Sequence, residues 1–174
     1  MTEKTIIYFH GYGSSPATDK VQTLKEHFSE VHAFPINIDP DFSLPYLEEE
    51  IDNLIVSNLN SEKELVFIGT SLGAWYAGQM ASKFRLEGSR CVLINPAHSM
   101  ESIKIDLPIP ENIKEKYNHL GFICPLHTKF FIANNDEVID FTNFHPKNAT
   151  YVKEADHRFN GKPFENVIEY VKGL

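Results

Sequence analysis

The chain has 174 residues, of which 42% are apolar and 23% are charged, and its formal net charge is −8. This length predicts a single domain over residues 1–174 with a core of its own, and the composition is ordinary for a globular protein. The negative charge argues against a nucleic acid or an anionic membrane as a partner, because phosphate binding requires clusters of basic residues.

The first part of the chain predicts strands and helices in alternation. Runs of β-branched and aromatic residues predict strands, and stripes of apolar residues three or four positions apart predict amphipathic helices. A glycine-rich turn, Gly-Tyr-Gly-Ser-Ser-Pro, follows the first of these strands. In chain order we expect a strand at 5–10, a helix at 18–28, a strand at 31–36, a loop at 37–43 and a helix at 44–59.

Residues 65–84 contain a strand, a tight turn and a helix in succession. The apolar run 65–68 predicts the strand, the pattern at 72–84 predicts the helix, and Gly-Thr-Ser-Leu-Gly between them matches G-x-S-x-G. A serine between two glycines at such a junction is typical of a nucleophile elbow, whose backbone requires small residues two positions before and after the serine. Ser71 is therefore the candidate nucleophile. The alternative is a glycine-rich turn that only makes room for the chain.

The remainder continues the alternation after one irregular stretch. Expected here are a strand at 90–95, an irregular insertion at 96–126 with a short helix near 111–120, strands at 127–133 and 150–155, and a helix at 163–171. Strands that alternate with helices form right-handed crossovers and a parallel sheet covered on both faces. We therefore predict a three-layer α/β/α sandwich with a mainly parallel six-stranded sheet.

Candidate catalytic residues follow three of these strands. Ligands of such sheets bind beyond the carboxyl ends of the strands, where Ser71, Asp136 and His157 are found in that order along the chain. This is the chain order of the α/β-hydrolase triad. A serine hydroxyl needs a neighbouring base to remove its proton, and an aspartate beside the imidazole fixes the tautomer that can do so.

Two other aspartates compete for the role of the acid. Asp140 is expected to start a helix, and Asp156 adjoins the histidine in the chain, where a productive pair of side chains is awkward. Each candidate also has an ordinary interpretation, since Asn-Asn-Asp at 134–136 favours a turn and His157 could be a solvated loop residue. The joint pattern is what favours catalysis.

The surroundings of the nucleophile are predicted from two other segments. The backbone N–H groups of Tyr12 and Leu72 are placed to form an oxyanion hole. The insertion at 96–126 is the candidate cover of the site, and Trp75 and His98 are candidate pocket residues. A shallow pocket of this kind favours short acyl groups. Alternatively, the insertion packs on the sheet edge and His98 is an ordinary loop histidine.

The sequence indicates neither a metal nor a cofactor. No histidine has the spacing of a metal ligand, and the turn at 11–13 lacks the spacing of a phosphate loop. Cys91 lies in an apolar run and Cys124 in a loop, so they form no disulfide framework. The N-terminus resembles no signal peptide, and no apolar stretch reaches about 18 residues. We therefore expect a cytoplasmic protein.

These motifs resemble the YqiA-type (UPF0227-like) esterases, a family of small bacterial α/β-hydrolases. The similarity spans most of the chain, through Ile-Tyr-Phe-His-Gly-Tyr-Gly-Ser-Ser-Pro at 7–16, Ile-Gly-Thr-Ser-Leu-Gly-Ala-Trp-Tyr-Ala at 68–77, Asn-Pro-Ala at 95–97, Asn-Asp-Glu-Val-Ile-Asp at 135–140 and Asp-His-Arg-Phe at 156–159. The chain departs from the family at Glu154-Ala155-Asp156, where glycines often precede the histidine, and at Ala74, where a second glycine often follows the elbow.

The resemblance implies a minimal α/β-hydrolase fold without a large cap and the strand order 2-1-3-4-5-6. It also implies ester or thioester hydrolysis without a cofactor, with Ser71 as nucleophile, Asp136 as acid and His157 as base. The leading hypothesis is a serine esterase that cleaves small carboxylic esters through an acyl-enzyme. A thioesterase or amidase with the same triad and a non-catalytic binding module are the alternatives, and the sequence leaves the oligomeric state open.

Overall fold

The computed structural model describes residues 3–57, 63–84 and 89–174. Six strands form one sheet in the order β2-β1-β3-β4-β5-β6, and every neighbouring pair is parallel. The strands are β1 (Lys4–Phe9), β2 (Glu30–Ala33), β3 (Glu64–Thr70), β4 (Arg90–Ile94), β5 (Thr128–Ala133) and β6 (Ala149–Val152). The helices are α1 (Asp19–His27), α2 (Pro40–Ser57), α3 (Leu72–Lys83), α4 (Glu111–Leu120) and α5 (Lys162–Lys172).

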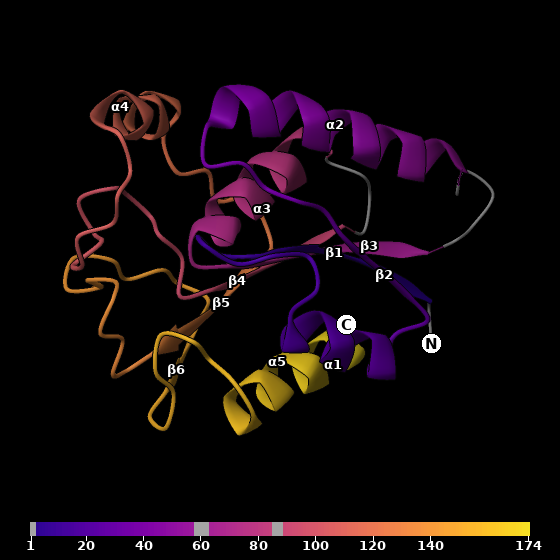
Figure 1. Ribbon diagram of the computed structural model, residues 1–174. Coiled ribbons are helices and arrows are strands. Elements are labelled where there is room, and N and C mark those ends of the chain that lie inside the picture. Colours follow the sequence, from indigo (N-terminus) through magenta and orange to yellow (C-terminus); the bar gives the residue numbers. More distant parts are fainter. Residues whose placement is uncertain (1–2, 58–62, 85–88) are drawn as a thin grey trace.

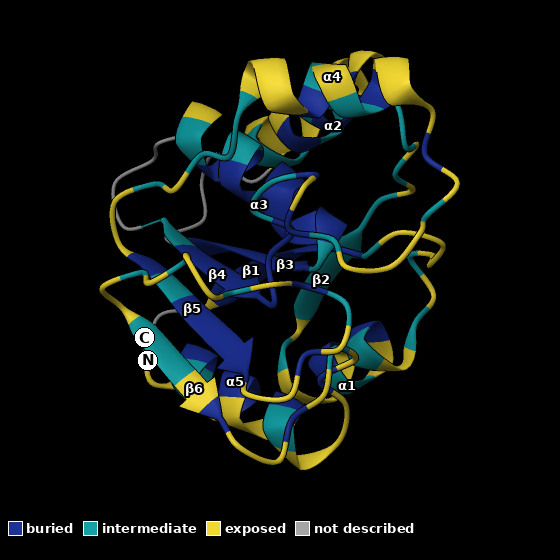
Figure 2. Cartoon of the chain, turned by 90° about the vertical axis from the view of Figure 1, so that its left-hand side faces the viewer, coloured by how far each residue is buried: buried dark blue, intermediate teal, exposed yellow. Residues whose placement is uncertain are grey.

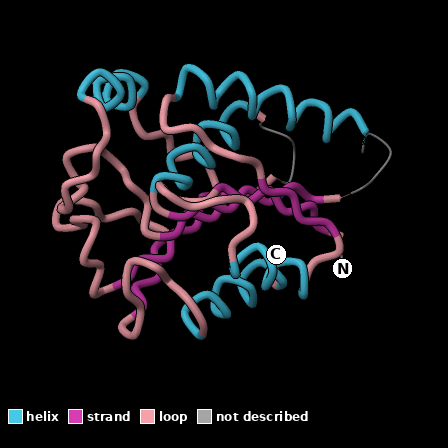
Figure 3. Tube along the Cα trace, in the orientation of Figure 1, coloured by secondary structure: helices cyan, strands magenta, loops and turns pink. Residues whose placement is uncertain are grey.

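Helices cover both faces of the sheet. Helices α2, α3 and α4 lie above it in Figure 1, and α1 and α5 lie below it; the same three layers can be followed along the chain trace in Figure 3. Side chains alternate along each strand. Phe67 therefore joins the core between the sheet and α3, while Val66 and Ile68 join the core between the sheet and helices α1 and α5. The strands in the middle of the sheet are therefore apolar on both faces and buried (Figure 2). The predicted α/β/α sandwich is confirmed.

The register of the sheet aligns the carboxyl ends of its central strands. Phe9 pairs with Gly69, and Thr70 pairs with Ile94. The N–H of Ser71 then donates to the carbonyl of Ile94 at 2.9 Å, which ties the residue after β3 to the end of β4. The segments that follow β1, β3, β4 and β5 consequently meet at one edge of the sheet, on the left of Figure 1.

Most expected elements form, with differences at their ends. The largest concerns α2, which begins at Pro40 and not at residue 44, because Asp39-Pro40-Asp41 starts a helix and does not continue the loop. Proline suits the first helical position, where no N–H partner is needed, and Asp39 Oδ1 accepts a hydrogen bond from the Asp41 N–H at 3.0 Å. The strands expected at 31–36 and 150–155 end earlier, at Ala33 and Val152. Residues 58 and 59 of the expected second helix lie outside the described residues.

The insertion at 96–126 contains α4 and otherwise lacks regular structure. Met100, Ile109 and Ile113 are buried in the core that also contains α3. The Tyr117 hydroxyl lies 2.7 Å from that of Tyr76 on α3 and donates to the carbonyl of Ile38 at 2.7 Å. Much of the insertion is thus packed as an extension of the core, with α4 at its outer corner.

Candidate active site

The junction of β3 and α3 has the backbone of a nucleophile elbow. Ser71 has φ 56° and ψ −121°, which is unusual for a residue other than glycine. A Cβ atom at Gly73 would lie 2.2 Å from the carbonyl oxygen of Phe9, and one at Gly69 would lie 2.5 Å from the Cα of Ala74. Both positions therefore require glycine. Although Ser71 occupies the N-cap of α3, its hydroxyl makes no capping hydrogen bond.

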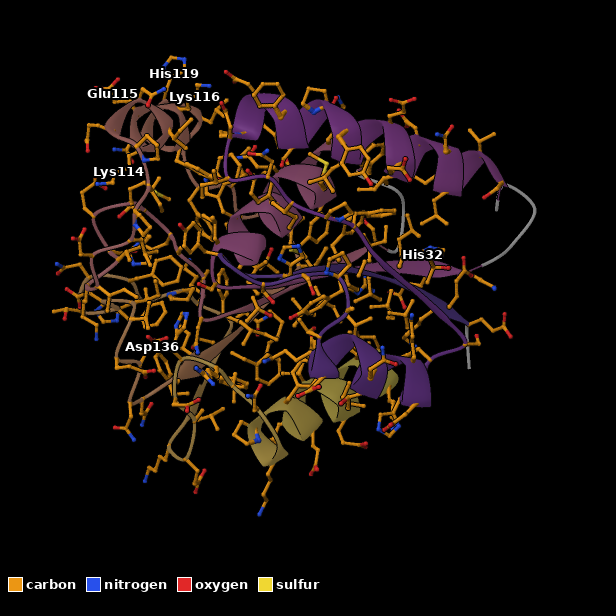
Figure 4. The ribbon with its side chains drawn as sticks, in the orientation of Figure 1. His32, Lys114, Glu115, Lys116, His119 and Asp136 are labelled. Carbon is orange, nitrogen blue, oxygen red and sulfur yellow. The ribbon has the colours of Figure 1, made fainter. Side chains whose placement is uncertain are left out.

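A chain of hydrogen bonds links three of the candidate residues. His157 Nε2 lies 3.1 Å from Ser71 Oγ, and His157 Nδ1 lies 2.8 Å from Asp136 Oδ2. Because an ionised carboxylate only accepts hydrogen bonds, this geometry assigns the proton to Nδ1 and leaves Nε2 to accept from the serine. Asp136 lies in the turn after β5 (Figure 4). Its side chain is only 2% exposed, against 15% for His157.

The buried carboxylate is itself held in place by the backbone. Asp136 Oδ1 accepts from the N–H groups of Val138 at 2.8 Å and Ile139 at 2.7 Å. Lys104 Nζ also donates to the carbonyl oxygen of Asp136. These bonds fix the turn and Oδ1 of the carboxylate, so the imidazole meets a preoriented acceptor.

The two competing aspartates are occupied elsewhere. Asp140 Oδ1 accepts from the N–H and hydroxyl of Thr142 at 2.9 and 2.6 Å, and Asp156 Oδ1 accepts from the N–H of Phe159 at 3.1 Å. Asp140 begins a turn, where the sequence predicted the start of a helix. Among the carboxylates of the described ranges, Asp136 is the one that hydrogen-bonds the imidazole of His157.

Three side chains from different elements hold the loop that carries His157. Asn95 Nδ2 donates to the carbonyls of residues 156 and 157 at 3.2 and 3.1 Å, while its Oδ1 accepts from the Ala133 N–H at 2.7 Å. Lys20 Nζ donates to the carbonyl of residue 158 at 2.5 Å. Glu137 Oε2 accepts from the N–H of His157 at 3.1 Å. Sequence reasoning did not assign roles to Asn95, Lys20 or Glu137, and the only signal was the Asn-Pro-Ala motif.

The turn after β1 passes beside the serine. A Cβ atom at Gly11 would lie 3.3 Å from that of Ser71. The His10 ring holds this turn, with Nδ1 2.9 Å from the Gly11 carbonyl and Nε2 accepting from the Ile36 N–H at 3.3 Å. Burial lowers the pKa of His10, although the bond to Gly11 opposes this. This neutral histidine orders the turn that leads to Tyr12.

Two hollows meet at this turn. A cleft of about 430 Å³ is lined by Ser71 and His157, and a pocket of about 160 Å³ shares residues 11–14 of that lining. The cleft is lined by Tyr8, Gly11, Tyr12, Gly13, Ser14, Thr18, Asp19, Lys20, Thr70, Ser71, His157, Arg158 and Asn160. The pocket is lined by His10, Gly11, Tyr12, Gly13, Ser14, Ile36, Asn37, Ile38 and Leu72. Tyr12 borders both hollows, and Leu72 borders the smaller one.

Trp75 and His98 lie together in a third cavity, of about 370 Å³, whose described lining does not include Ser71. Trp75 is 1% exposed and packs edge-on against Tyr117 on α4. His98 stacks on Phe144 with the ring centroids 4.4 Å apart, and its Nε2 lies 3.0 Å from the Asp140 carbonyl. The structure thus brings Ser71, Asp136, His157 and Tyr12 to one place and sets Trp75 and His98 apart from it.

Two kinds of feature are absent from the described residues. These residues contain no group of three or more histidine, cysteine, aspartate or glutamate side chains arranged to hold a metal ion. The helices within these ranges also lack the combination of length and apolar character that a bilayer-spanning helix needs. The charged residues of α4, such as Lys114, Glu115 and His119, lie far from Asp136 in Figure 4.

The fold is similar to that of solved α/β-hydrolases. Alpha/beta hydrolase domain-containing protein 10 from mouse matches with a TM-score of 0.67 and 17% identity, over 100% of this chain and 91% of that one. Est1E from Butyrivibrio proteoclasticus matches with a TM-score of 0.67 and 15% identity, over 99% and 86%. The esterase Pf2001 from Pyrococcus furiosus matches with a TM-score of 0.61 and 17% identity, over 99% and 84%.

The match at the level of sequence is to a family model. It covers residues 5–118, a stretch that includes the turn after β1, the elbow and Asn95. The similarity predicted from the motifs is thereby confirmed: the chain belongs to the uncharacterised protein family UPF0227, and its fold is that of an α/β-hydrolase.

Proposed function

We propose that this protein is a serine esterase that cleaves small carboxylic esters through an acyl-enzyme. The observation that carries the proposal is the hydrogen-bonded sequence Ser71–His157–Asp136 at the carboxyl edge of the sheet. His157 takes the proton of Ser71 as the oxygen attacks the ester carbonyl, and it returns that proton to the departing alcohol. Asp136 keeps the proton on Nδ1 and stabilises the charged imidazole.

The oxyanion that forms at the carbonyl needs hydrogen-bond donors. Leu72 is the first residue of α3, so its N–H has no acceptor within the helix. We assign this N–H and that of Tyr12 to the oxyanion hole, since the turn at residue 11 lies against Ser71. Such preorganised donors contribute about 2.7–4 kcal/mol each to transition-state stabilisation where they have been measured. Water then attacks the acyl-enzyme by the same path.

The same triad geometry serves thioesterases and amidases. Activity assays with esters, thioesters and amides therefore identify the bond that is cleaved. The similarity to solved esterases supports oxygen esters as the first substrates to test. The strained backbone at Ser71 argues against a non-catalytic binding module. Such strain costs about 1–3 kcal/mol, and a binding module would have no need to retain it.

The test is labelling by a fluorophosphonate, which requires an activated serine, together with hydrolysis of 4-nitrophenyl acetate. Wild-type protein should be labelled at Ser71, and Ser71→Ala should lose labelling and about a thousandfold or more in kcat. Ser57→Ala is the matched control, because its hydroxyl bonds the Leu54 carbonyl within α2. Labelling that persists in Ser71→Ala would refute the proposal.

A further inference from the structure

The cleft that contains Ser71 is lined without aliphatic side chains. Among the described residues that line it, the side chains are hydroxyls, a carboxylate, an amide, the imidazole of His157, two cations and two tyrosines. The smaller pocket differs in that Ile36, Ile38 and Leu72 are among its lining residues. An ester bound at Ser71 presents two halves to these two hollows. The pocket with the aliphatic side chains suits a short acyl chain, and the cleft suits the alcohol half.

Two cations line the cleft, and the first is hydrogen-bonded within the protein. Lys20 Nζ donates to the Arg158 carbonyl at 2.5 Å and to Asn160 Oδ1 at 2.6 Å. Burial and the charge of Arg158 lower the pKa of Lys20, while the carboxylates of Asp156 and Asp19 raise it. Lys20 therefore holds the backbone that follows His157.

The second cation, Arg158, has no such partners. Its side chain is exposed, and the residue lines the cleft together with Ser71 and His157. Within the part of the chain that the structure describes, its guanidinium makes neither a hydrogen bond nor an ion pair. Arg158 directly follows His157, and Lys20 fixes its carbonyl, so its backbone is held beside the candidate base.

We propose that the cleft binds the alcohol half of an ester that carries a carboxylate, and that Arg158 is the specificity-determining residue that pairs with it. The inference rests on the proposed function and adds a substrate class to it. A guanidinium matches a carboxylate with two parallel hydrogen bonds, and that of Arg158 has no such partner among the described residues. The net charge of −8 repels anions at long range, so the preference depends on this local contact and not on the general field.

The test uses two acetyl esters that differ in charge, 4-acetoxybenzoate and the neutral 4-acetoxybenzamide. Comparing each variant with wild type on the same substrate cancels the difference in intrinsic reactivity. Arg158→Gln should lower kcat/KM on the benzoate about tenfold more than on the benzamide. Arg158→Lys should restore part of this difference. Lys147→Gln removes the same charge from an exposed site outside the cleft, and it should change the ratio by less than about twofold.

The possible outcomes separate this inference from the function on which it rests. Equal losses on the two substrates would mean that Arg158 acts through the His157 loop, and no loss would mean that it is merely solvated; both overturn the carboxylate site. A charge-dependent loss seen only with a carboxylate on the acyl half, as in mono-4-nitrophenyl succinate, would overturn the assignment of the two halves. If fluorophosphonate fails to label Ser71 in wild-type protein, the proposed function itself fails.

Discussion

Removing the side chain of Asn95 tests how the fold positions His157, the proposed base. Asn95 is fully buried, and its amide joins the end of β5, through the Ala133 N–H, to the loop that carries His157. Its φ of 43° lies in the left-handed region, where alanine would add strain of about 1–2 kcal/mol. Asn95→Gly is therefore the variant of choice, because glycine accepts this backbone and the change removes the side chain, with its hydrogen bonds and buried volume, without adding backbone strain.

The size of the effects on stability and on kcat follows from which hydrogen-bond partners of Asn95 are left unpaired. Ala133 is 3% exposed, so its N–H loses its acceptor in a buried place, at a cost of roughly 1–3 kcal/mol in the free energy of unfolding. The carbonyls of residues 156 and 157 belong to a more exposed loop and can bond water instead. Their release lets the imidazole shift, and a displacement of about 1 Å can lower the rate by about a hundredfold. We expect a loss in kcat of about ten- to a hundredfold with KM little changed.

Urea unfolding and steady-state kinetics on 4-nitrophenyl acetate measure the two effects separately. Asn148→Ala is the control, since its exposed side chain bonds the Thr128 carbonyl at the start of β5, away from the site. It should change kcat and the unfolding midpoint little. An Asn95→Gly protein that is destabilised yet keeps its kcat within about twofold of wild type would refute the reasoning, because Asn95 would then serve only the strand end.

Three further predictions concern the acid, the acyl pocket and the sheet edge. Asp136→Asn should lower kcat by about 10⁴, whereas Asp156→Asn should cost little; the reverse result would show that the acid is Asp156. Across 4-nitrophenyl esters, kcat/KM should peak between acetate and hexanoate, since each methylene gains about 0.8 kcal/mol only while the pocket beside Ile36 can bury it, and a maximum at laurate would contradict this. Burial alone would raise the pKa of Glu30, but hydrogen bonds from Lys63 and other groups lower it to about 2. Stability from this group is therefore present above about pH 4.3 and lost as the pH falls toward 2, so acid titration of Glu30→Gln should show a smaller loss over this window than wild type, and an equal loss would contradict it.

Local pattern was enough to predict the elements and the elbow. An apolar run that ends in Gly-Thr-Ser-Leu-Gly and continues as an amphipathic pattern forms a strand, a tight turn and a helix, because these depend on the period of apolar residues and on backbone sterics. The alternation of such units dictates a parallel sheet, whose strand ends meet at one edge. Ser71, Asp136 and His157 could therefore be placed at that edge before any contact was known.

Sequence pattern could not decide which loop side chains touch. Asp136, Asp140 and Asp156 are all short acidic residues in loops, and only the path of each turn determines that Asp136 reaches the imidazole while the others bond their own backbone. The same holds for Asn95, whose partners lie 38 to 62 residues away along the chain. Trp75 follows the elbow by one helical turn, yet its ring packs toward α4 and away from the cleft lined by Ser71.

The sequence by itself thus determined the alternation of strands and helices, the layers it implies and the serine at the tight turn, because each follows from a pattern among residues that are neighbours in the chain. Only the tertiary structure decided which carboxylate meets His157, which side chains hold its loop, and that an arginine lines a cleft without aliphatic side chains. Those features depend on contacts between loops distant in sequence. Their geometry is set by packing between these distant segments, and apart from the Asn-Pro-Ala motif around Asn95 it leaves no period or motif in the chain.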